Sequence, residues 1–252
     1  MAGLGQFFLK AQGAPAAQDS GAEAWKRTYV HNTYALQCRI TMEAMEDELY
    51  GVFPEFGREL ARAAAYTQEV NAMDLFNNAG TAVQYTANGT GYPLLSQVHF
   101  RADGGTWSNQ LSSGADLTIE SLEALLNQWS SGMVDQRGRK LAIQPVRLVV
   151  GTDDRFNAQR IVNSIQRPFT ADNDPNTIRA LDLQVIVMTH MTNDGRWFLM
   201  ADKKETAVLW FNRRPISLQR ETDGLATGNL VLTGSYRESH GITHPTGVAG
   251  SL

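Results

Sequence analysis

One stretch of helical periodicity, from Pro54 to Asn78, constrains the fold of this 252-residue chain more than any other feature. The proline is tolerated in the first turn of a helix, and Gly80 stands where a helix commonly stops. At about 1.5 Å per residue such a helix is about 37 Å long. Its apolar side chains recur at helical spacing and predict one buried stripe, made of Phe56, Leu60, Ala63, Val70, Met73 and Phe76.

The segment before this helix has the period of a β-strand. A short strand from Trp25 to Val30 and a turn at His31–Asn32 would make it a hairpin with the strand that follows. An isolated hairpin is marginally stable in water, so we expect its apolar face to lie on another surface, which belongs to another subunit if the hairpin projects. Apolar residues alternate with polar or small ones along the second strand, at Tyr34, Leu36, Cys38, Ile40 and Met42.

The remainder of the chain mixes short helices with strands. Helices are expected at 118–131, where Thr118 or Asp116 is the cap, and after Thr152–Asp153, with Phe156, Ile161, Val162 and Ile165 on the apolar face. A polar loop at 166–179 contains two prolines and is typical of a functional or contact segment. The order of elements shows no regular alternation of strand and helix and therefore predicts an α+β fold. Strands are expected at 147–150, 183–188, 197–200, 207–211, 216–222 and 230–237.

Composition excludes several classes of protein. The 22 basic and 26 acidic residues give a net charge of -4, which argues against a nucleic-acid-binding protein. The single cysteine, Cys38, excludes an intrachain disulfide and fits a reducing compartment. No apolar run is long enough to span a bilayer, and the first residues do not form a convincing signal peptide. We expect a soluble protein that is made inside a cell.

A search for catalytic chemistry yields one weak candidate. His240 and His244 stand four residues apart, as zinc ligands on a helix do, but Gly241 and Pro245 argue against a helix there. No glycine-rich phosphate loop and no nucleophile elbow is present in the sequence, and Cys38 fits the apolar face of a strand better than a nucleophilic role. We therefore expect no catalytic residue, no cofactor and no metal.

Several strings, in this order, resemble the major capsid proteins of tailed phages with the Hong Kong 97-type fold, most closely the branch of the Mu-like major head subunit. Thr41, Glu43 and Asp47 occupy the family's Thr-x-Glu-x-x-x-Asp positions at the entry to its long spine helix. The resemblance spans roughly residues 25 to 251. The strings that carry it are RITMEAMEDELYG, LFNNAG, GYPLLSQVHF, GGTWSNQL, RLVVG, RPFTADNDPNTIR, WFLMADKK and YRESHGITHPTGVAGS.

This resemblance implies a division of the chain into parts. The order is an N-terminal arm (1–23), an E-loop hairpin (24–45), a peripheral domain with the spine helix (46–150), an axial domain (151–205), return strands of the peripheral domain (206–239) and a C-terminal tail (240–252). Family members usually carry more residues before the E-loop, so either the arm is short or an upstream part lies outside this sequence.

The resemblance also implies a structural function. Copies of the chain would assemble as hexamers and pentamers into the icosahedral head of a bacteriophage, a virion structure built in the host cytoplasm. Scaffolding, portal and decoration proteins, and non-specifically contacted double-stranded DNA, are further expected partners. Expected inter-subunit contacts are Trp25, Tyr29, Tyr34, Leu36, Ile40 and Met42 in the E-loop, and Arg167, Phe169, Asp172, Asp174 and Arg179 in the axial-domain loop.

Three alternatives stay open at this point. An encapsulin-type compartment shell shares the fold but holds cargo enzymes, and the loose polar segment 1–23 argues against it. A small metal-dependent enzyme would use His240 and His244 and would be a monomer or small oligomer. A decoration or tail subunit is disfavoured by the long helix.

Overall fold

A computed structural model describes residues 25–47, 51, 53–87, 89–167, 174–192, 195–222 and 227–252, together with residues 12, 15, 18 and 19. The expected N-terminal arm therefore lies almost wholly outside the described residues. The chain forms two compact units, each assembled from segments that are far apart in the sequence. Unit 1 comprises Met1–Thr28, Leu75–Val208 and Ile242–Leu252, and unit 2 comprises Tyr29–Asp74 and Leu209–Gly241. The domain ranges that the resemblance implies stay predictions.

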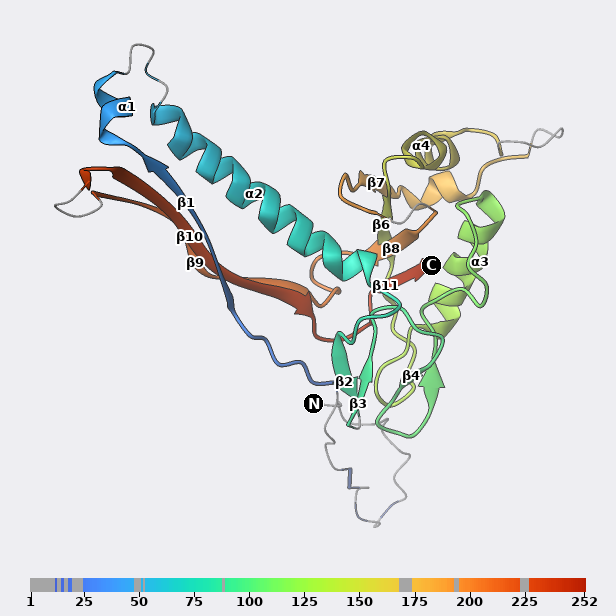
Figure 1. Cartoon of the computed structure of the whole chain (residues 1–252). Helices are drawn as coiled ribbons and strands as arrows, with labels where there is room; N and C mark the ends of the chain where they lie inside the picture. The colour runs from blue at the N-terminus through green and yellow to red at the C-terminus, as the bar shows by residue number, and fades with distance from the viewer. Residues whose placement is uncertain are drawn as a thin grey trace. The chain divides into compact units, whose positions relative to one another are not determined.

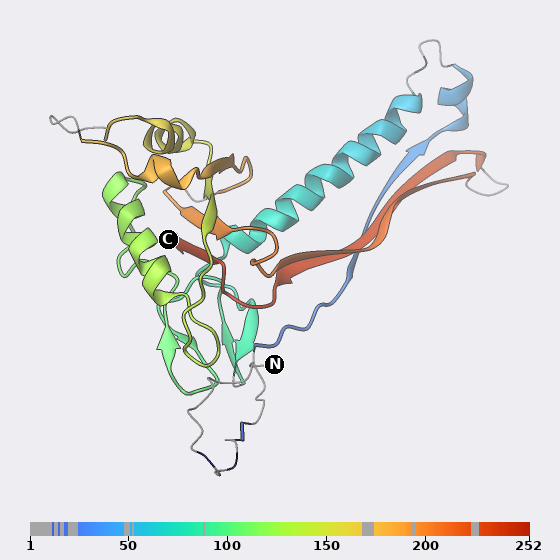
Figure 2. The same ribbon diagram turned by 180° about the vertical axis from the view of Figure 1, so that it is seen from behind.

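Unit 2 is a three-stranded sheet with a long helix beside it (Figures 1 and 2). The strand order is β1–β10–β9, so β10 is central and β9 is an edge strand. The elements that lie wholly or mostly in this unit are β1 (Asn32–Ile40), α1 (Met42–Glu46), α2 (Phe53–Asn77), β9 (Val208–Thr222) and β10 (Leu230–Ile242).

The long helix confirms the strongest sequence expectation, because α2 spans Phe53–Asn77. Ion pairs between residues three apart, Glu55 with Arg58 at 2.9 Å and Glu59 with Arg62, support its exposed side. Leu60 and Phe76 of the expected stripe are buried, at 6% and 5% exposed. Phe56 and Met73 are half-buried, and Val70 is 38% exposed, which differs from the expected burial. The apolar stripe of α2 is therefore covered unevenly within the chain.

The expected hairpin over residues 25–42 is wrong, since β1 pairs with β10 and not with the segment before it. Antiparallel pairing joins every residue of β1 to β10, from Asn32 opposite Glu238 to Ile40 opposite Leu230. Lys26 instead forms an isolated bridge with Thr86 in unit 1. The physical reason is strand length, because a partner of six residues would leave part of the backbone of β1 unpaired and the long β10 pairs all of it.

Unit 1 contains a four-stranded mixed sheet in the order β11–β8–β6–β7. Its β6 and β7 are parallel and are joined through a helix, so the chain contains one βαβ crossover that the sequence did not predict. The elements are β2 (Tyr85–Ala87), β3 (Thr90–Tyr92), β4 (His99–Phe100), β5 (Thr106–Trp107), α3 (Ile119–Gly132), β6 (Pro145–Val150), α4 (Arg155–Asn163), η1 (Ile178–Leu181), β7 (Gln184–Val187), β8 (Trp197–Ala201) and β11 (Val248–Ser251).

Helix α3 and the mixed sheet share the largest core of unit 1. Thr118 caps α3 as expected, and its side chain accepts from the Ser121 backbone N–H at 3.1 Å while the Ser121 hydroxyl accepts from the Thr118 N–H at 2.9 Å. The fully buried Trp197 on β8 donates its indole N–H to the Ala115 carbonyl at 2.9 Å. The buried side of α3 is that expected, with Ile119, Leu122, Leu125 and Trp129 in the core.

Two further expectations differ from the structure. On α4, Ile161 and Val162 are buried, but Phe156 is 71% exposed, and Ile165 beyond the helix is 72% exposed. The C-terminal residues of the chain form β11, which is fully buried and pairs antiparallel with β8. Among the described residues, no helix is long and apolar enough to cross a membrane.

Candidate subunit interface

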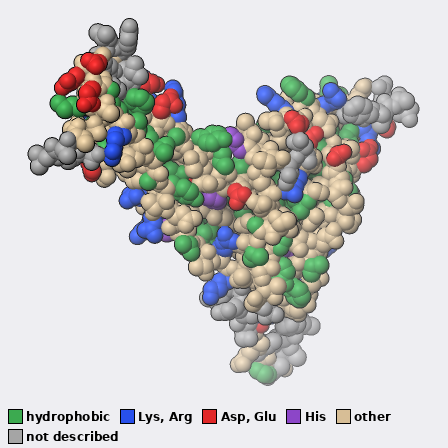
Figure 3. All heavy atoms as spheres, viewed as in Figure 1, with side chains coloured by type: hydrophobic (Ala, Val, Ile, Leu, Met, Phe, Trp, Pro, Cys, Tyr) green, Lys and Arg blue, Asp and Glu red, His purple; other side chains and the backbone are tan. Residues whose placement is uncertain are grey.

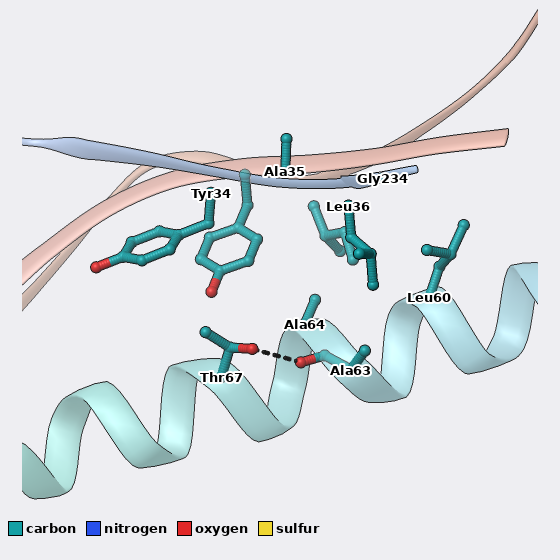
Figure 4. A pocket seen from close by; sticks show the side chains of 10 residues that line it. Tyr34, Ala35, Leu36, Leu60, Ala63, Ala64, Thr67 and Gly234 are labelled. Carbon is teal, nitrogen blue, oxygen red and sulfur yellow. Dashed lines mark hydrogen bonds between the residues drawn. The ribbon is translucent and has the colours of Figure 1, made fainter. Parts of the chain in front are cut away.

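The alternating apolar face of β1 is turned toward α2 within unit 2 (Figure 4). Tyr34 stacks on Tyr236 of β10 with ring centroids 5.1 Å apart, and Leu36 extends toward the helix. Ile40 is 5% exposed, so it is a core residue and is not available to another subunit. Between the sheet and α2 lies an open cavity of about 210 Å³, lined by Tyr34, Ala35, Leu36, Leu60, Ala63, Ala64, Thr67, Ile216, Gly234 and Tyr236.

Two other expected E-loop contacts also pack inside the chain. Trp25 belongs to unit 1, where it stacks on His244 at 5.5 Å between ring centroids and meets Tyr85 edge-on at 6.4 Å. Tyr29 belongs to unit 2 and packs edge-on against Phe211 of β9 at 4.8 Å. Trp25 is therefore a half-buried side chain beside a core and not part of a projecting hairpin.

Unit 2 nevertheless presents many large apolar side chains to solvent. Leu36 and Met42 of the expected E-loop set are 55% and 47% exposed. Large apolar side chains are also exposed on α2, at Tyr66, and on the edge strand β9, at Trp210. Hydrophobic side chains are visible across the surface in Figure 3. Among the described residues of this unit, the exposed large apolar side chains are Val30, Leu36, Met42, Tyr66, Val70, Leu209, Trp210, Phe211, Ile216 and Leu218.

The expected axial-domain loop is only partly described, since Phe169 and Asp172 lie outside the described residues. Arg167 makes ion pairs within unit 1, to Glu120 at 3.1 Å and Glu123 at 3.5 Å on α3. Its backbone N–H donates to the Asp174 carbonyl at 2.9 Å, which closes the base of the loop. Asp174 and Arg179 are exposed. The structure thus gives Arg167 an anchoring role inside the chain and leaves Asp174 and Arg179 at the surface.

Two exposed apolar residues, one on α4 and one just after it, differ from the sequence expectation. The helical spacing that Phe156 and Ile165 share with Ile161 and Val162 predicts a buried helix face for all four residues. The helix is only nine residues long and ends at Asn163, so Ile165 falls beyond it, and Phe156 lies on the outer side of its first turn. The Arg155 guanidinium carbon lies 5.8 Å from the centre of the Phe156 ring. No signal in the single sequence distinguishes such a residue from a core residue.

A buried polar network lies in unit 1, at β4. The His99 Nδ1 lies 2.5 Å from the Tyr85 hydroxyl, and its Nε2 lies 2.7 Å from the Asn109 Oδ1. Because that oxygen also accepts from the Ser96 N–H at 3.0 Å, it is an acceptor, so we assign the ring proton to Nε2 and the donor role at Nδ1 to the hydroxyl of Tyr85. Burial lowers the pKa of His99 to about 4, and burial also raises the pKa of Tyr85.

The histidine pair considered as a metal site has no supporting arrangement. His240 lies in β10 of unit 2, whereas His244 belongs to unit 1. The His244 Nδ1 lies 2.5 Å from the Thr246 hydroxyl, and burial lowers the pKa of this histidine. Within the described ranges, no group of three or more histidine, cysteine, aspartate or glutamate residues could hold a metal ion.

The comparison with protein families and the comparison with solved structures agree with each other. A family model described as phage capsid protein matches residues 25–250. No curated protein sequence matches the chain significantly.

Three solved capsids share its fold. The capsid protein in the structure of cyanophage P-SCSP1u is 12% identical to this chain, with a TM-score of 0.60. The match covers 99% of this chain and 80% of the cyanophage chain. The capsid of the empty GTA particle is 9% identical, with a TM-score of 0.60 and coverages of 98% and 80%. The capsid of phage XM1 is 12% identical, with a TM-score of 0.56 and coverages of 100% and 83%.

Proposed function

This chain belongs to the phage capsid protein family, and on that premise we propose that it is the major capsid protein of a tailed phage. It is a structural protein of the virion and not an enzyme, and its fold is the α+β capsid fold of the Hong Kong 97 type. Many copies assemble into the icosahedral shell that encloses the genome. In finer detail, the proposed peripheral domain is divided between the units, with 46–74 and most of the return strands (206–239) in unit 2 and 75–150 in unit 1, the proposed axial domain (151–205) lies in unit 1, and we assign the chain to the Mu-like branch.

The observation that carries this proposal is the apolar surface of unit 2. A monomeric protein seldom exposes so many large apolar side chains on one small unit, whereas a subunit of a shell buries them against its neighbours. The exposed members of the expected E-loop set, Leu36 and Met42, are therefore proposed contacts between copies. Ile40 and Trp25 are not part of that contact, because both pack within the chain.

A second contact is proposed around the loop of unit 1. The exposed Asp174 and Arg179 flank it, and the exposed apolar side chains of Phe156 and Ile165 lie on elements that precede it in the chain. We assign this surface to contacts within hexamers and pentamers. Arg167 acts indirectly, because its ion pairs to α3 hold the base of the loop. Scaffolding, portal and decoration proteins and the packaged DNA complete the set of proposed partners.

The test is electron microscopy of the purified protein in negative stain, with light scattering to measure particle mass. The wild-type chain is expected to form uniform shells, or rings of five and six copies. Leu36→Asp places a charge on a side chain that is 55% exposed, so the variant should fold and yet form no shells. A small monodisperse wild-type species that never assembles would contradict the proposed function, and nucleic acid inside the shells would separate a phage head from a cargo-holding compartment.

A further inference from the structure

Strand β9 is an edge strand with nothing on its outer side in the described chain. It is 15 residues long, stands at one end of the order β1–β10–β9, and is exposed at every position except Val208 and Ser217, which are half-buried. A long, open edge offers its unpaired backbone groups and both rows of side chains to another chain. In a protein that works as an assembly, such an edge is a place where a second copy can bind.

The middle of this edge carries two adjacent arginines, Arg213 and Arg214. Both are exposed, and neither forms an ion pair within the part of the chain that the structure describes. The Arg214 guanidinium donates to the Ser235 hydroxyl at 3.3 Å. Just before them, Trp210 is 59% exposed and Phe211 is 39% exposed. The segment 210–214 therefore combines two unneutralised positive charges with two exposed aromatic rings.

The chemical complement of this segment lies on helix α1 of the same unit. The helix has no buried residue, carries Glu43 and Glu46, and is followed by Asp47. All three acidic side chains are exposed, and none forms an ion pair among the described residues. Met42, at its start, is 47% exposed and adds an apolar contact. Figure 3 shows acidic side chains gathered around α1.

Within one copy the two charged segments are held apart. The Met42 backbone N–H donates to the Asn229 Oδ1 at 3.3 Å, and the Met42 side chain lies against Gly228. These contacts hold α1 beside the connection between β9 and β10. Arg214 stands eight residues before the end of β9 at Thr222, a distance of about 27 Å along a strand. The acidic helix therefore cannot neutralise Arg213 and Arg214 of its own copy.

We propose that segment 210–214 of β9 binds helix α1 of a second copy, with Arg213 and Arg214 paired to Glu46 and Asp47 and the aromatic rings packed near Met42. The proposal rests on the proposed function and names one contact through which the shell is built. A second copy is favoured over nucleic acid because the chain has a net charge of -4 and the two arginines stand beside aromatic residues and not in an extended basic patch.

Charge reversal tests the contact in the full-length protein. R213E/R214E and E46K/D47K should each fold, as judged by circular dichroism, and should each lose the shell fraction in gradient sedimentation and electron microscopy. The fourfold variant that carries both reversals restores the attraction in the opposite sense, so its shells should return. The matched control is K203E/K204E, which makes the same change in net charge at an exposed adjacent pair of unit 1 and should assemble as the wild type does.

A cysteine pair keeps the proposal testable if a reversed variant fails to fold. In E46C/R213C, mild oxidation of assembled shells should join copies into a ladder of covalent multimers on a non-reducing gel. Neither single variant should give that ladder, and the same single variants control for the native Cys38. Normal assembly of both reversed variants, failure of the fourfold variant to regain shells, or absence of the ladder would overturn the contact while leaving shell formation by the wild type intact. Normal shells that package less DNA would assign the arginines to nucleic acid instead.

Discussion

Burial within unit 1 keeps the imidazole of His99 neutral, because it lowers the pKa of this residue to about 4. Its imidazole is fully buried, accepts from Tyr85 at Nδ1 and donates to Asn109 at Nε2, and both ring nitrogens are thereby used in the neutral state. Protonation would place a second proton on Nδ1, against the hydroxyl that now donates to it. The network joins β2, β4 and β11, because Asn109 also donates to the Val248 carbonyl at 3.0 Å. Its integrity therefore depends on pH.

We expect the subunit to lose stability on acidification through this residue. The unfolded chain binds a proton on His99 near pH 6.5, but the folded chain binds it only near pH 4, because burial lowers the pKa to about 4. Between these values the unfolded state holds more protons, so the free energy of unfolding falls as pH falls, by up to about 3 kcal/mol.

Urea unfolding of the unassembled subunit at pH 7, 5.5 and 4.5 measures this loss. His99→Gln should be less stable at pH 7 and should show a shallower dependence on pH, whereas His240→Gln, outside the network, should keep the wild-type slope. Some pH dependence remains in the His99 variant, because burial also lowers the pKa of His244. An unchanged slope in His99→Gln would show that the network does not couple protonation to folding.

A second residue-scale prediction separates core from contact on one strand face. Ile40→Asp puts a carboxylate where the side chain is 5% exposed, and we expect a loss of about 4 kcal/mol or more in the free energy of unfolding. Leu36→Asp, on the same face but 55% exposed, should cost less than about 1.5 kcal/mol. Thermal unfolding followed by circular dichroism compares the two, and equal losses would contradict the assignment of Leu36 to the surface.

Among the elements, α3 offers a cap whose contribution can be isolated. Thr118→Ala removes the oxygen that accepts from the Ser121 N–H, so the free energy of unfolding should fall by about 1 kcal/mol. Asp153→Ala is the matched control, since the sequence predicts a cap at Thr152–Asp153, whereas the N-cap of α4 in the structure is Asp154 and has no side-chain cap hydrogen bond. A loss at Asp153 as large as that at Thr118 would contradict the difference between the two helix starts.

The same elements show what a single sequence can reveal. The two amphipathic helices were located to within one residue, because their periodicity, caps and stops all agree. The partner of β1 could not be predicted, because alternation reveals a strand and its faces but not the strand it pairs with. Here that partner is β10, and the paired residues run from Asn32 with Glu238 to Ile40 with Leu230, about 200 positions apart in the sequence. The exposure of Phe156 could not be predicted, because in a short helix three or four apolar residues can match the spacing of a buried stripe by chance. The expected contact surface was therefore found in part, with Leu36 and Met42 exposed and Ile40 buried.

At the scale of the whole molecule, the buried tryptophans and the exposed Trp210 fall in different units. The largest buried cluster, which includes Trp107, Trp129 and Trp197, belongs wholly to unit 1. Unit 2 contains a single tryptophan, the exposed Trp210. Tryptophan fluorescence and near-ultraviolet circular dichroism therefore report mainly on unit 1, whereas loss of the long α2 is visible in the far-ultraviolet helical signal.

This separation predicts that the units respond differently to damage. Leu60→Asp charges a side chain of α2 that is 6% exposed, and it should lower the helical signal while the buried tryptophans of unit 1 keep their native emission. Leu122→Asp, at a fully buried position on α3, should shift that emission to longer wavelength. Because the same substitution is made at Leu60 and at Leu122, a difference between the two variants reflects the unit in which each residue lies. Loss of both signals together in Leu60→Asp would mean that the chain unfolds as one cooperative body, and the shell would then be built from a single folding unit in place of two.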